Sequence, residues 1–120
     1  MKTEKELIKD FAPHGHLRGG EFYLPYPKAL EFIDECAKNE LAVVGVDGYT
    51  HFPEDDGIMA HFDMIANFCD AKSQHPNWND WVDHCRRASH EFLQTLASEG
   101  KTLENHLFNF VALSKKRWEE

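Results

Sequence analysis

The chain has 120 residues, of which 42% are hydrophobic and 28% are charged, and its formal net charge at pH 7 is −8. This composition is typical of one folded domain and excludes a disordered chain, and no apolar run approaches the ~20 residues that span a bilayer. The acidity argues against a nucleic-acid-binding protein, because phosphates would be repelled. The N-terminus does not resemble a signal peptide, and three widely spaced cysteines predict reduced thiols, so we expect a cytoplasmic protein.

The first forty residues predict two helices separated by a loop. Thr3 and Glu6 form a capping-box pattern that begins a helix over residues 3–11. Residues 12–26 contain several glycines and prolines and are interpreted as a loop. Pro27 suits a first helical position, and apolar residues at helical spacing predict a second helix over 27–39.

The next segment, 41–52, begins with a continuous apolar run over residues 41–46, which predicts a central strand covered on both sides. Gly45 within it indicates a bulge or a close backbone approach. Asp47 and Gly48 allow two interpretations, a tight hairpin turn or a strand that continues to Phe52. In either case residues 53–57 form a turn.

Residues 58–69 fit two patterns. Every even position from 58 to 68 is apolar, which predicts a strand, whereas Ile58, Phe62, Ile65 and Cys69 would also form a helical stripe. The complete alternation favours the strand. A long helix is then predicted over 79–98 and a closing strand over 106–114. The chain is therefore predicted to be a single α+β domain, residues 1–120, with a small, mostly antiparallel sheet packed by helices.

Eight histidines raise the possibility of a metal site. His14 and His16 form a chelating pair on a loop, and His61 and Asp63 would lie on one face of a strand. A metal-binding protein or metal-dependent enzyme that uses these four residues is the alternative reading. No nucleophile, phosphate-binding or dinucleotide motif is present, and we therefore expect a protein that is not an enzyme and has no cofactor.

The negative charge is concentrated in residues 41–84, which hold eight acids against one base, a balance of −7. A concentrated acidic surface that carries aromatic residues is either an interface with a basic partner or an ordinary solvent-exposed face, and both interpretations are open from the sequence. The candidate partner-binding residues are the acids, the histidine and the tyrosine of the two predicted strands and their turn: Asp47, Tyr49, His51, Glu54, Asp55, Asp56, Asp63 and Asp70.

The succession of elements resembles the small immunity proteins of bacterial polymorphic-toxin and contact-dependent growth inhibition systems. The resemblance lies in the segments PKALEFI (27–33), AVVGVDGY (42–49), MIANFCD (64–70), ASHEFL (88–93) and FNFV (108–111). It implies a cytoplasmic antitoxin that binds a cognate toxin domain, often a basic nuclease, and binds neither nucleic acid nor membranes. We expect a monomer or a weak homodimer. The resemblance does not explain the number of histidines.

Overall fold

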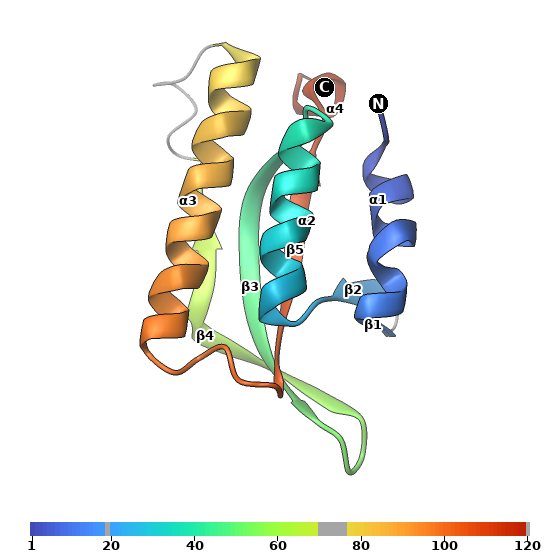
Figure 1. Ribbon diagram of the computed structural model, residues 1–120, viewed down its shortest axis with the longest axis vertical. Helices are drawn as coiled ribbons and strands as arrows, with labels where there is room; N and C mark the ends of the chain where they lie inside the picture. The colour runs from blue at the N-terminus through green and yellow to red at the C-terminus, as the bar shows by residue number, and fades with distance from the viewer. Residues whose placement is uncertain (19, 70–76, 120) are drawn as a thin grey trace.

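The computed structural model describes residues 1–18, 20–69 and 77–119 of the chain. Three antiparallel strands form the main sheet in the order β4-β3-β5: β3 is Ala42–Phe52, β4 is Gly57–Asn67 and β5 is His106–Leu113. Helices α1 (Glu4–Phe11), α2 (Tyr26–Lys38) and α3 (Trp78–Ser98) lie side by side on one face of this sheet (Figure 1). The predicted α+β architecture with a small antiparallel sheet is confirmed.

The helices begin where side chains can cap them. Thr3 and Glu6 form the predicted capping box at α1, and Asn77 accepts hydrogen bonds from the backbone of Asn79 and Asp80 at the start of α3. Each helix then buries one apolar stripe. Phe32 of α2, for example, packs against Phe110 of β5 with the ring centroids 5.0 Å apart.

Strand β3 is the central strand, as predicted, and its residues 42–46 are all buried. The main core joins Val43 and Val46 of this strand to α1, α2 and the C-terminal half of α3. A second cluster packs Ala42 and Val44 against Trp81 and other residues near the start of α3. The sheet therefore buries its helix-covered face along most of its length.

Two irregularities shape the sheet. The pairing of β3 with β5 shifts register between Val43 and Gly45, which confirms a bulge at the predicted glycine. The interpretation of Asp47 and Gly48 as a hairpin turn is wrong, because β3 continues to Phe52. A second register shift occurs there instead, between Asp47 and Tyr49 in the pairing with β4. The strand interpretation of segment 58–69 is confirmed as far as Asn67, where β4 ends, and the β3–β4 hairpin projects beyond the helices (Figure 1).

The prediction that residues 12–26 form a loop is wrong. This segment contains a short 3-10 helix, η1 (Ala12–His14), and two paired strands, β1 (His16–Arg18) and β2 (Glu21–Tyr23). Gly20 has a φ of 80°, a left-handed conformation that glycine adopts without strain, and it permits the tight connection. Leu24 follows β2 and exchanges two backbone hydrogen bonds with Phe108, which attaches this small hairpin to the edge of β5.

A short helix at the end of the chain, α4 (Lys115–Trp118), was not predicted. Ser114 caps it by accepting a hydrogen bond from the backbone of Arg117. Its last residue, Trp118, packs against Trp81 of α3 with ring centroids 5.8 Å apart. All three cysteines are free thiols, with Cys36 and Cys85 buried.

Candidate functional site

The face of the sheet opposite the helices is partly uncovered. Directly paired residues of antiparallel strands share a face, and Asp47 pairs with Ile65 on one side and with Asn109 on the other. Ile65 and Val111 are each 47% exposed, a large value for aliphatic side chains in a sheet. We call this surface the open face and define it by three pairs of residues: Asp47 and Tyr49 of β3, Ile65 and Asn67 of β4, and Asn109 and Val111 of β5.

The β1–β2 hairpin forms one border of the open face. The ring of Tyr23 meets that of Tyr49 edge-on, with centroids 5.1 Å apart. The Asn109 amide Nδ2 donates to the carbonyl oxygen of Phe22 at 2.7 Å and to Oε2 of Glu21 at 3.2 Å. Two tyrosine rings therefore lie together beside a second carboxylate, that of Glu21.

Asp47 is the unusual group of the open face. Burial raises the pKa of its carboxyl group, and within the described part of the chain this carboxylate makes no hydrogen bond or ion pair. The pKa of the neighbouring Tyr49 hydroxyl is also raised, first by burial and then by the charges of Asp47 and Glu21. A partly desolvated, unpaired carboxylate destabilises the isolated protein, and a cation placed beside it would remove that cost.

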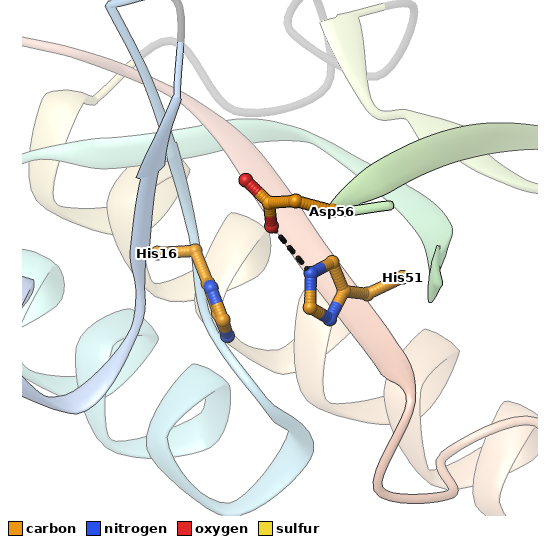
Figure 2. Close-up of side chains that lie close together, drawn as sticks. All are labelled: His16, His51 and Asp56. Carbon is orange, nitrogen blue, oxygen red and sulfur yellow. Dashed lines mark hydrogen bonds and ion pairs between the residues drawn. The ribbon is translucent and has the colours of Figure 1, made fainter. Parts of the chain in front are cut away.

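A second group lies beside the turn of the projecting β3–β4 hairpin. Figure 2 shows His16 of β1, His51 of β3 and Asp56 of the β3–β4 turn facing one another. His51 Nε2 lies 2.8 Å from Asp56 Oδ1, and the rings of His16 and His51 have centroids 4.7 Å apart. The other Asp56 oxygen, Oδ2, forms an ion pair with the guanidinium of Arg18 at 3.2 Å. The hydrogen bond from His51, and then the charge of Arg18, lower the pKa of Asp56.

This group borders an open hollow of about 680 Å³, whose lining includes His14, His16, His51 and Glu104. One potential ligand atom from each of His16, His51 and Asp56 lies within 4.8 Å of the other two. The structure therefore brings together two of the predicted partner-binding residues, His51 and Asp56, with a residue from the predicted metal group, His16.

The predicted metal group His14, His16, His61 and Asp63 is divided by the fold. His14 and His16 line the hollow. His61 hydrogen-bonds to Thr50, whose side chain is on the opposite face from Tyr49. The ring of His61 meets that of His106 edge-on, with centroids 6.3 Å apart. Asp63 forms an ion pair with Lys101 at 2.8 Å, and that hydrogen bond lowers its pKa. These four residues do not form one site.

The remaining predicted contact residues are dispersed. Glu54 and Asp55 lie at the exposed tip of the β3–β4 hairpin, close in the sequence to the exposed Phe52. Asp55 has a structural role there, because its Oδ1 accepts a hydrogen bond from the backbone of Gly57 at 2.9 Å. Asp63 is bound to Lys101, and Asp70 lies outside the described residues.

The sequence interpretation missed Glu21 and Tyr23 because it treated their segment as a loop. A partial signal was available in the pair Gly19-Gly20, because two consecutive glycines are a typical hairpin turn.

Comparison of the chain with protein-family models, with curated proteins and with solved structures gave no match in any of the three. Among the helices that the structure describes, none combines the length and apolar character needed to cross a membrane.

Proposed function

We propose that the protein binds and neutralises a basic protein partner, a cognate toxin domain, through the open face of its sheet. One observation carries the proposal: Asp47, beside Tyr49 on β3, presents a partly buried carboxylate with no partner among the described residues. It lies directly across from the exposed side chain of Ile65, and the exposed Val111 lies one pair further along the same face. A partly buried, unpaired carboxylate does not help the isolated protein to fold, but it can bind a positively charged group of a partner.

The chemistry of the face favours an arginine of the partner over other groups. A guanidinium can bind a carboxylate through two parallel hydrogen bonds and can also stack on an aromatic ring. Asp47 and Glu21 supply carboxylates on this face, and Tyr23 and Tyr49 supply rings. Ile65 and Val111 provide apolar area that the same partner would bury.

The identification of the partner as a toxin rests on the resemblance of the sequence to immunity proteins. An immunity protein acts by stoichiometric binding and needs no catalytic group. Toxins that cleave nucleic acids are commonly basic, and an acidic inhibitor complements such a surface.

The test is affinity capture from a lysate of the source organism, with the wild type, Asp47→Asn and Glu91→Gln as baits. Glu91→Gln is the matched control, because it also removes one negative charge but lies on an exposed position of α3. We expect one basic protein that is released by salt, that is toxic when expressed alone and that is harmless when co-expressed with the wild type. Asp47→Asn should raise the Kd by at least ~30-fold, because truncating one member of a desolvated charge pair costs ~2–5 kcal/mol.

Two results would refute the proposal. If Asp47→Asn and Glu91→Gln bind the partner equally, the open face is not the binding surface. If no partner is captured and the protein instead forms a concentration-dependent dimer that Val111→Glu dissociates, the open face belongs to a second copy of this chain. Replacing Asp55 and Asp56 with lysine, which reverses their charge, would be a poor test of the interface, because both carboxylates form hydrogen bonds within the hairpin and its turn.

A further inference from the structure

We propose that His16, His51 and Asp56 bind one divalent transition-metal ion through two imidazole nitrogens and one carboxylate oxygen. This inference is independent of the proposed partner binding, since it rests on a different group of side chains. The three ligand atoms come from β1, β3 and the turn between β3 and β4, and all lie within 4.8 Å of one another.

The distances are close to those of a bound ion. Zinc–nitrogen and zinc–oxygen bonds of ~2.0–2.1 Å place neighbouring ligand atoms of a tetrahedral site ~3.3 Å apart. His51 Nε2 and Asp56 Oδ1 are already 2.8 Å apart, and a small separation of the two would admit the ion between them. His16 requires only a closing movement of its exposed side chain.

The surroundings hold two of these ligands in place. Asp56 has a φ of 56°, in the left-handed region that aspartate and asparagine tolerate, and this conformation turns its carboxylate back toward His51. Arg18 binds the second carboxylate oxygen, Oδ2, and leaves Oδ1 for the ion. The backbone of His51 donates to the carbonyl oxygen of Asn105 at 2.7 Å, which anchors the strand on which this histidine lies. Such supporting contacts orient metal ligands in known sites.

The hollow beside the cluster leaves room for further ligands. Its lining includes His14 and Glu104 as well as His16 and His51. Three protein ligands with an open fourth position are typical of zinc sites that bind water or an additional group. Imidazole and carboxylate ligands suit zinc, cobalt, nickel and iron(II) better than calcium or magnesium.

The alternative is a metal-free hydrogen-bonded cluster, in which a proton lies between His51 and Asp56. A metal ion at Nε2 would replace that proton, and in a neutral imidazole the proton would move, by way of the solvent, to Nδ1 of the same ring. The charged groups near the site act in opposite directions: the positive charge of Arg18 opposes binding, while the carboxylate of Glu104, which lines the hollow, favours it.

The experiment is a titration of the untagged, EDTA-treated full chain with ZnCl₂ by calorimetry at pH 7.5, and with CoCl₂ by visible absorption. The variants are His16→Gln, Asp56→Asn and the control His90→Gln. His90 is a matched control because it also hydrogen-bonds to an aspartate, Asp34, at 2.8 Å, but among the described residues it belongs to no three-ligand group. Asp56→Asn keeps a residue that tolerates the left-handed turn.

We expect one saturable ion per chain, with an affinity that falls at least ~10-fold in His16→Gln and in Asp56→Asn and is unchanged in His90→Gln. Melting curves in EDTA show whether each variant is folded, and a melting temperature within a few degrees of the wild type makes its titration decisive. If Asp56→Asn unfolds, the His16→Gln result decides alone, because that side chain is exposed. No saturable binding by the wild type, or equal loss in His90→Gln, would overturn the proposal.

Discussion

Replacing Gly48 with alanine tests the part of the sheet that positions Asp47. Gly48 lies in β3 at the register shift toward β4, and a Cβ added there would be 2.7 Å from the Met64 Cβ and 2.6 Å from its Cε. Carbon atoms in contact are normally ~3.5–4.0 Å apart. Rotation of the Met64 side chain moves Cε but not Cβ, and Met64 is almost fully buried, so the two strands must separate by close to an ångström.

Overpacking of this kind lowers the free energy of unfolding by ~1–3 kcal/mol, whereas replacing a glycine restricts the unfolded chain and raises it by ~0.4–1 kcal/mol. We therefore expect Gly48→Ala to lower the free energy of unfolding by about 1–2 kcal/mol and the Tm by roughly 5–10 °C. Gly45→Ala is the matched control in the same strand, because its added Cβ would have its nearest neighbours at 3.5–3.7 Å, which is ordinary contact. Thermal unfolding followed by circular dichroism measures both. Equal Tm values for the two variants would show that Met64 does not lie over Gly48 and that the β3–β4 register is wrong.

Two further predictions concern titrating groups. Burial raises the pKa of Asp47 in the folded state, so its contribution to stability is fully present below the unfolded pKa of ~4 and is lost as the pH rises through the folded value. Asp47→Asn should therefore raise the free energy of unfolding at pH 7 by on the order of 0.5 kcal/mol and leave it unchanged near pH 3. Urea unfolding at the two pH values measures this difference. An equal increase in stability at both pH values would contradict the prediction. Burial also raises the pKa of the Cys36 thiol strongly, and burial with a smaller effect of Cys69 raises the pKa of Cys85 to about 12. A thiol reagent at pH 8 should therefore modify only Cys69 rapidly in the native protein, and all three cysteines after denaturation. Rapid modification of all three cysteines in the native protein would refute the packing of α2 and α3.

The long elements were predictable because each one carries its own periodic pattern. The strand at 42–52 is uniformly apolar over its first half, and the helix at 78–98 repeats apolar residues at helical spacing. The β1–β2 hairpin was not predicted because each of its strands has only three residues, too few for a period to be visible. Its stability comes from elsewhere in the chain, through the two hydrogen bonds between Leu24 and Phe108.

Prediction of the two candidate sites from the sequence was limited by the same unpredicted β1–β2 hairpin. Asp47 and Tyr49 could be placed on one face from the alternation of a strand alone. Their neighbours Glu21 and Tyr23, and His16 beside His51, could not, because contacts between residues about thirty positions apart depend on how β2 joins the edge of β5. Local patterns contain no information on that junction.

The fold also changes the meaning of the acidic segment. In the sequence, residues 41–84 form a strongly negative block, but three of its carboxylates are ion-paired with bases from outside it: Asp56 with Arg18, Asp63 with Lys101, and Asp83 with Arg86 and Arg87. The linear charge density therefore overstates the field that an approaching partner would experience. Asp47 differs from these acids because its charge is partly desolvated and unpaired among the described residues. Dispersed surface charges mainly accelerate encounter, whereas a desolvated charge pair mainly slows dissociation. The open face is accordingly better suited to holding a basic partner through one anchoring carboxylate than to attracting it from a distance.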